Sequence, residues 1–328
     1  MADRSFSPVF LGSVFIGVPL LVAVAWMTDW SEALRVFVSY ELIYVAWFAA
    51  FAVANLLSYT LIWLWFLELE NVAVPWWRAF NYRMAGGAIS YVTPGPRLGG
   101  ELTRADLVSS ETSWRIGLST SFAEKAILFV SGLLFDTSVV TTAVLFSLSA
   151  YYGAFVLVSV VVGLVVIAAL LYGLKRVSSQ STVIGAIIDT VVSTAMGQHV
   201  ANVKDDLSRY ATSYPWRMAL IVAFGVGTKA LIAAQFYALV LGAGFHVSFW
   251  EACVLAAALD IAYSIPSYMG LGALEGGQAA AASWVGLSTG VGVIIALLAR
   301  LRDLAMSAYG LLVLLYYGGV GSLTSWFN

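Results

Sequence analysis

Six stretches of this 328-residue chain are apolar over about the 20 residues that a helix needs to cross a bilayer. They are Val9–Met27, Leu42–Leu67, Trp114–Phe135, Thr141–Leu174, Trp216–Leu241 and Val291–Tyr317. The chain is 61% hydrophobic and 10% charged, whereas soluble domains carry about 25% charged residues. A soluble protein of this length could not hide so much apolar surface, so we predict an all-α polytopic membrane protein with about six spanning helices.

Lysine and arginine gather in two connections, and their placement predicts the orientation in the cell membrane. Five arginines lie within residues 78–115 and a second basic group within residues 175–217, whereas residues 28–41 are net acidic. Basic connections face the cytoplasm. Both basic regions fall on that side if the N-terminus is cytoplasmic, and the C-terminus is then cytoplasmic too.

Two further stretches echo each other, and each breaks an apolar run with proline and glycine. One runs from Val74 to Glu101 and the other from Val247 to Glu275, with tyrosine three residues before proline in both. Their arms are too short to span: Trp77–Val92, Leu98–Ser110, Ser248–Ile265 and Leu271–Val285. We therefore predict two re-entrant helical hairpins, because paired interrupted segments mark transport sites in membrane proteins.

The hairpins divide the chain, residues 1–328, into two inverted halves of one integral membrane domain. The halves cover residues 8–136 and 141–318, and Asp136 is predicted to lie at the turn that ends the third span. Residues 178–214 are predicted to form an amphipathic helix on the cytoplasmic surface, with an ordinary loop as the alternative. The charges of Asp205 and Asp206 in this connection favour a solvated cluster over a metal-binding carboxylate pair.

Charged side chains occur near the middle of three predicted spans, where they are costly and usually functional. They are Glu124, Lys125, Lys229, Arg300, Arg302 and Asp303. Four cations against two carboxylates predict a surplus of positive charge that an anionic ligand, or Glu101 and Glu275 on the hairpins, must balance. The alternative is a set of structural ion pairs that hold the helices together.

Spacing along the helices suggests how these charges pair. Arg300 and Asp303 are three residues apart and share a helix face, so we expect them to pair. Arg302 then needs another partner. Glu124 is expected to meet Arg300 or Arg302, which leaves the adjacent Lys125 for a ligand.

The first hairpin tip adds the residues of an anion site. Glycine and proline between Thr93 and Glu101 prevent regular helix there and expose backbone N–H groups, which attract anions at a helix start. The residues concerned are Arg97, Gly99, Gly100, Glu101 and Arg104. The second tip has no arginine and leads to Glu275.

Several classes of protein are disfavoured by what the sequence lacks. The formal net charge is −2, and the one cysteine, Cys253, excludes an internal disulfide. No phosphate-binding loop, dinucleotide fingerprint or nucleophile elbow is present, so no nucleotide hydrolysis is expected. We predict no nucleic-acid partner, no metal and no cofactor, and no catalytic residues.

The runs Thr93–Ala105 and Pro266–Gly276, with Glu124 and Lys125 between them, resemble signatures of the flippase-like membrane domain of lysylphosphatidylglycerol synthases. The resemblance covers about residues 8–318, and Arg300 sits where that family tends to carry a basic residue. Arg97 within the tip, and lysine at position 125 in place of arginine, depart from the family pattern. No segment resembles the aminoacyl-transferase domain, so the resemblance implies a stand-alone member and not lipid lysylation.

The family resemblance implies movement of a charged amphiphile between leaflets, and the predicted cavity suits an anionic one. We therefore expect a transporter, not an enzyme, for an anionic phospholipid or a polyprenyl-phosphate-linked lipid, working by alternating access. One alternative is an ion- or proton-coupled carrier of a small soluble anion, and another is a membrane-embedded transferase acting on a lipid-linked substrate. The expected partners are such a lipid and the membrane, with a homo-oligomer left open.

Overall fold

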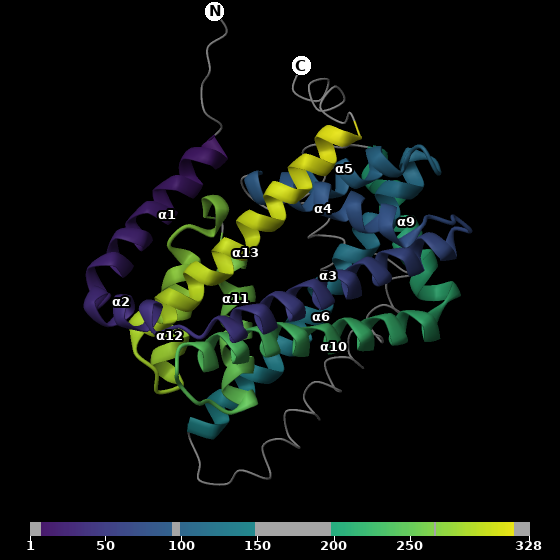
Figure 1. Ribbon diagram of the computed structural model, residues 1–328. Coiled ribbons are helices and arrows are strands. Elements are labelled where there is room, and N and C mark those ends of the chain that lie inside the picture. Colours follow the sequence, from purple (N-terminus) through teal and green to yellow (C-terminus); the bar gives the residue numbers. More distant parts are fainter. Residues whose placement is uncertain (1–7, 94–98, 148–197, 266, 318–328) are drawn as a thin grey trace, which may run out of the picture. The chain divides into compact units, whose positions relative to one another are not determined.

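The computed structural model is built from helices. It describes residues 8–93, 99–147, 198–265 and 267–317 (Figure 1). These residues contain eleven α-helices and one 3-10 helix, and no strand occurs among them. The all-α prediction is therefore confirmed for the described part of the chain.

Within each described stretch of the chain, the helices follow one another with short connections. Their bounds are α1 Pro8–Met27, α2 Trp30–Val38, α3 Leu42–Leu69, α4 Trp76–Val92, α5 Gly99–Val108, α6 Trp114–Ser147, α9 Gln198–Ser213, α10 Pro215–Gly242, α11 Phe249–Ser264, η1 Tyr268–Gly270, α12 Ala273–Trp284 and α13 Thr289–Tyr316. Polar caps set several of the starts. Ser248 and Glu251 form a reciprocal capping box at α11, and the Ser288 hydroxyl accepts from the Val291 N–H at α13.

Three helices are long and apolar enough to cross a membrane, namely α3, α10 and the part of α6 from Trp114 to Ala143. Each matches a predicted span. Helices α1 and α13 form within two residues of the predicted bounds, but α13 carries Arg300, Arg302 and Asp303 at its centre and is not among the three. Most of the fourth predicted span, Thr141–Leu174, lies outside the described residues.

The prediction of a turn at Asp136 is wrong, because α6 continues without a break to Ser147. No glycine or proline stands between Leu134 and Ala143 to end the helix. The Ser138 hydroxyl donates to the Leu134 carbonyl at 2.7 Å. Short polar side chains can be satisfied within their own helix in this way, so the polar residues after Phe135 do not stop it.

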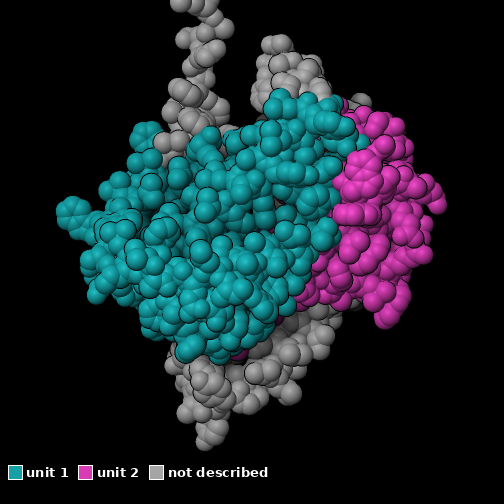
Figure 2. Space-filling model, viewed as in Figure 1, with its two compact units in different colours: residues 1–57, 80–103, 230–328 teal, residues 58–79, 104–229 magenta. Residues whose placement is uncertain are grey.

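The chain forms two compact units that interleave along the sequence (Figure 2). Unit 1 comprises residues 1–57, 80–103 and 230–328, and unit 2 comprises residues 58–79 and 104–229. These units are not the predicted halves at residues 8–136 and 141–318. The division into inverted halves stays a prediction.

Within unit 1, α12 packs against α11, α13 and α1, and α2 packs against α13. Gly292 of α13 allows one of these helices to approach another closely. A Cβ at this position would lie 2.5 Å from the Gln278 carbonyl oxygen and 2.7 Å from the Ala279 Cα atom. Helices α12 and α13 are therefore in near-backbone contact, and this contact fixes where their charged side chains meet.

Unit 2 has its own apolar core where α3, α6, α9 and α10 meet. Its buried members include Ile62, Phe66, Ala123, Tyr210 and Ile221. The Phe66 and Tyr210 rings are tilted against each other at a centroid distance of 5.4 Å. Helix α9 is thus packed into the unit through Tyr210. Residues 198–213 of the predicted amphipathic connection are helical, and its placement on the cytoplasmic surface stays a prediction. Residues 178–197 of the predicted connection lie outside the described part.

Candidate functional site

Each predicted hairpin contains two helices. Helices α4 and α5 form the first pair and α11 and α12 the second, close to the predicted arms. Residues 94–98, which include Arg97, lie outside the described part. In the break between α11 and α12, Met269, Gly270 and Gly272 have positive φ angles of 52°, 72° and 72°.

A buried ion pair joins α5 to α6. Arg104 Nη1 lies 2.5 Å from Glu124 Oε2, and Arg104 Nη2 donates to the Ser121 carbonyl at 3.3 Å. The guanidinium carbon is 5.1 Å from the centre of the Trp63 ring. The two charged side chains are 5% and 1% exposed. The α5–α6 ion pair therefore ties the second arm of the first helix pair to the long helix that follows.

A second buried ion pair joins α12 to α13. Arg300 Nε and Nη2 lie 2.8 and 2.6 Å from Glu275 Oε1. Arg300 also donates to the carbonyls of Met269 at 3.1 Å and Gly270 at 3.3 Å. The other carboxylate oxygen, Glu275 Oε2, accepts from the Gly272 N–H at 2.9 Å. The α12–α13 ion pair therefore holds the break of the second helix pair through both of its members.

One turn along α13, a third polar group surrounds Asp303. Arg302 lies 2.8 Å from the Asp303 carboxylate and donates to Gln235 Oε1 of α10 at 2.7 Å. The Tyr263 hydroxyl of α11 donates to the other carboxylate oxygen of Asp303. The Arg302 guanidinium carbon is 5.6 Å from the centre of the Phe48 ring of α3. Four helices of unit 1 thus meet at Asp303.

The pairings expected from spacing differ from those found. The expected pair of Arg300 with Asp303 is wrong, because Arg300 turns to the Met269 and Gly270 carbonyls and to Glu275 on α12. Asp303 pairs instead with its neighbour Arg302. Glu124 was expected to meet a cation of α13, and the structure gives it Arg104.

The other predicted site residues lie on the same helices. Glu101 is buried at 5% exposure on α5, and Lys229 is buried at 6% on α10. Lys125 is half-buried on α6. The Gly100 N–H was expected to face a ligand, but it donates to Ser90 Oγ at 3.0 Å. The Gly99 carbonyl accepts from the Thr103 hydroxyl.

The charges of the predicted site residues in the described part of the chain are nearly balanced. The cations are Arg104, Lys125, Lys229, Arg300 and Arg302, and the carboxylates are Glu101, Glu124, Glu275 and Asp303. Glu275 is one of the two carboxylates that the sequence offered to balance the surplus, and the structure pairs it with Arg300. A negatively charged ligand would therefore have to compete with a protein carboxylate for its guanidinium group.

Asp206 on α9 was expected to be solvated, and the structure corrects this. It is 9% exposed and accepts from Ser119 Oγ at 2.7 Å and Arg209 at 3.1 Å. Arg209 also pairs with Glu70, and the Tyr210 hydroxyl donates to the same Glu70 carboxylate at 2.6 Å. Burial first, and then the hydrogen bond to Glu70, raise the pKa of Tyr210 above its ordinary range.

These contacts on α9 are structural and hold the helix to α3 and α6. The hydrogen bond to Glu70 is the main cause that raises the pKa of Arg209, so this guanidinium stays charged. Glu70 itself was missed by the sequence reasoning, since it follows an apolar span like any loop residue. Among the residues that the structure describes, no cluster of three or more histidine, cysteine or acidic side chains is placed to hold a metal ion.

Comparison with known proteins gives one match. Neither the curated proteins nor the solved structures gave a match to this chain. Residues 9–310 match the family model described as the lysylphosphatidylglycerol synthase TM region. That range contains both helix pairs, both buried ion pairs and the three apolar candidate spans. The chain belongs to this family of membrane domains, which is associated with lipid handling.

Proposed function

We propose that this protein moves a lipid with a negatively charged head group between the two leaflets of the cell membrane. A phospholipid or a polyprenyl-phosphate-linked lipid fits this description. The observation that carries the proposal is the α12–α13 ion pair, in which a buried guanidinium holds the break of a helix pair. Membership of a family associated with lipid handling supports the same choice.

The contacts of Arg300 suggest how a head group would bind. A guanidinium group offers a planar fork that matches the oxygens of a phosphate. A lipid phosphate reaching Arg300 would compete with Glu275 and with the Met269 and Gly270 carbonyls. When a phosphate replaces Glu275 at Arg300, the Glu275 carboxylate keeps the hydrogen bond that it accepts from the Gly272 N–H. Binding would then release the break of the second helix pair.

The proposal includes a membrane arrangement of about six spanning helices and two re-entrant hairpins in inverted halves. The arms α5, α11 and α12 have 10, 16 and 12 residues, fewer than the roughly 20 that cross a bilayer. Both ion pairs join the second arm of a helix pair to the long helix that follows, and this shared connection supports a repeat. In one the arginine lies on the hairpin arm, and in the other it lies on the following helix.

An ion- or proton-coupled carrier of a small soluble anion is the second candidate, and the polar group around Asp303 favours it. Ionisable side chains within a membrane helix commonly line the path of an ion or a soluble substrate, and Asp303 contacts Arg302 and the Tyr263 hydroxyl there. The two candidates differ in the path of the cargo. Lipid transport needs an opening toward the bilayer, whereas a small anion needs a path closed from lipid.

Lipid movement in proteoliposomes tests the proposal. The full chain is reconstituted with labelled phospholipids and with a labelled polyprenyl phosphate, and wild type is compared with the double variant Glu275→Gln, Arg300→Gln. Removing both charges leaves no buried ion without a partner, so the fold should survive. Loss of charge-assisted contacts to the head group should slow transport about tenfold or more.

The matched control is the double variant Arg78→Gln, Glu111→Gln, which removes an ion pair whose side chains are 40% and 19% exposed. This control should move lipid at the wild-type rate. Equal rates for wild type and the Glu275–Arg300 variant, across all lipids tested, would refute the assignment. Uptake of a soluble phosphate ester without lipid movement would favour the second candidate.

A further inference from the structure

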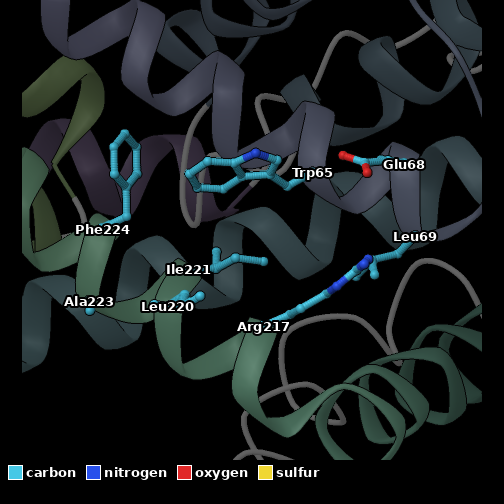
Figure 3. Close-up of a pocket in the computed structure, with 8 residues that line it drawn as sticks. All are labelled: Trp65, Glu68, Leu69, Arg217, Leu220, Ile221, Ala223 and Phe224. Atoms are coloured by element: carbon cyan, nitrogen blue, oxygen red, sulfur yellow. The ribbon is translucent and has the colours of Figure 1, made fainter.

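Unit 2 contains a pocket of about 560 Å³ between the end of α3 and the start of α10 (Figure 3). Its walls are mainly apolar and are formed by Trp65 on one side and Leu220 and Ile221 on the other. The Trp65 and Phe224 rings meet edge to face at a centroid distance of 4.9 Å. None of these residues belongs to the proposed transport site.

The pocket is polar at one end and apolar at the other. Figure 3 shows Arg217 and Glu68 at one end and Phe224 and Ala223 at the opposite end. Arg217 and Phe224 are seven residues apart on one helix, a distance of about 10 Å along its axis. Both helices are candidate membrane spans, and the charged end of the pocket lies at the end of both. The apolar end therefore points along the spans, in the direction of an acyl chain.

The charged end offers one cation and one anion. Arg217 is exposed, and its guanidinium carbon lies 5.8 Å from the centre of the Tyr214 ring. Neither Arg217 nor Glu68 forms an ion pair with any side chain in the described part of the protein. The exposed Trp216 and Leu220 beside them suit the membrane interface, where aromatic rings settle.

We propose that this pocket binds one phospholipid whose head group carries a phosphate and a primary ammonium group, as phosphatidylethanolamine does. Arg217 receives the phosphate, because guanidinium and phosphate form charge-assisted hydrogen bonds. Glu68 accepts from the ammonium group, which phosphatidylglycerol lacks and whose N–H donors a choline lipid does not have. One acyl chain fills the apolar groove toward Phe224. The site is separate from the proposed transport of an anionic lipid and does not depend on it.

Native mass spectrometry of the full chain measures this binding directly. The purified protein is stripped of lipid and titrated with phosphatidylethanolamine, phosphatidylcholine and phosphatidylglycerol of the same acyl chains. Wild type should bind one phosphatidylethanolamine about tenfold more tightly than either of the others, a ratio expected for one charged contact. Arg217→Ala should weaken phosphatidylethanolamine binding by about the same factor. Glu68→Gln should remove the preference over phosphatidylcholine.

Substitutions with bulky side chains that fill the groove distinguish binding in this pocket from lipid binding elsewhere on the protein. Leu220→Trp should abolish the bound lipid, and Ala223→Phe fills the same groove independently if the first variant is poorly folded. The controls are Leu312→Trp, at an apolar position 65% exposed on α13, and Arg35→Ala, an exposed arginine on α2. Undiminished binding in both filled variants, or a preference for phosphatidylglycerol, would overturn the proposal. So would equal affinity for all three lipids.

Discussion

The two buried ion pairs make the same connection with opposite polarity. In both, the second arm of a helix pair is joined to the long helix that follows. Arg104 stands on the arm and Glu124 on the long helix in the first pair, whereas Glu275 stands on the arm and Arg300 on the long helix in the second. The same architectural need, anchoring a short arm, is therefore met twice with the charges exchanged.

The surroundings of the two pairs differ more than their geometry does. The α5–α6 ion pair is almost fully enclosed and has the Trp63 ring over its guanidinium. The α12–α13 ion pair is more exposed, at 14% and 4%, and its arginine also holds two backbone carbonyls of the break. From this comparison we propose that the first pair serves stability and that the second is a contact that a ligand can exchange.

The largest expected loss of stability follows from breaking the enclosed α5–α6 ion pair. Arg104→Gln leaves Glu124 buried without its guanidinium, and loss of one partner of a buried pair costs about 3–5 kcal/mol. Arg300→Gln should cost less, because Glu275 keeps the Gly272 N–H and is nearer to solvent. Thermal unfolding of the purified proteins in detergent measures both changes.

Adding Glu124→Gln to Arg104→Gln is the control, since it removes the uncompensated charge. The double variant should regain much of the stability that the single variant loses. If Arg300→Gln destabilises the protein more than Arg104→Gln does, the result would contradict the proposal that the α5–α6 ion pair serves stability and the α12–α13 ion pair serves ligand exchange.

The next effect concerns transport and uses a substitution that keeps the positive charge. Arg300→Lys retains the cation but loses the planar fork, so it cannot reach Glu275 and both carbonyls together. Lipid movement in proteoliposomes should fall about tenfold, the cost of losing roughly one charge-assisted hydrogen bond. Arg104→Lys is the matched control and should retain transport in the fraction that is folded. Equal losses in both lysine variants would remove the functional distinction between the pairs.

Much of the architecture was predictable from local sequence. Proline and glycine after Val92 and Ile265 interrupt regular helix, so the two helix pairs and their approximate bounds followed from residue type. The long apolar helices followed from composition and length. The turn placed at Asp136 failed because polar residues were taken to end a helix that contains no breaking residue there.

The partners of the charged residues could not be read from spacing. Arg104 and Glu124 were both selected as site residues, the first for its place near a tip and the second for its depth in a span. Their pairing depends on how α5 packs on α6, which no local pattern contains. In the same way Arg300 shares a helix face with Asp303, yet it meets Glu275 of α12 and the two carbonyls of the break beside α12 instead.

A contact outside both ion pairs gives the next smaller effect. Tyr210→Phe removes the hydroxyl that donates to Glu70 and should cost about 1 kcal/mol at neutral pH. Burial and Glu70 raise the pKa of Tyr210, so the folded state holds this proton more tightly than the unfolded state does. The tyrosine's contribution is therefore present below the unfolded value of about pH 10 and is lost as the pH rises above it.

Thermal unfolding between pH 8 and pH 11, roughly spanning that value, checks the sign. Wild type should lose more stability than Tyr210→Phe over this interval, so that the two curves converge. Parallel curves would mean that neither burial nor Glu70 raises the pKa of Tyr210 in the folded state. Variants of either buried ion pair should leave this difference unchanged, because Tyr210 touches neither pair.

The smallest effect probes the backbone that Arg300 holds. Met269 has a φ of 52°, a left-handed conformation that costs a side chain about 1–2 kcal/mol and glycine almost nothing. Met269→Gly should therefore raise the unfolding temperature slightly, after the entropy lost by glycine offsets about half of the gain. Met269→Val should lower it, because a branched Cβ fits this conformation worst. If the α12–α13 ion pair enforces the conformation, both shifts should shrink in the double variant Glu275→Gln, Arg300→Gln. Shifts of unchanged size in that background would mean that the break keeps its conformation without Arg300. A lipid phosphate that displaced Glu275 from Arg300 would then not release the break, as we propose it does.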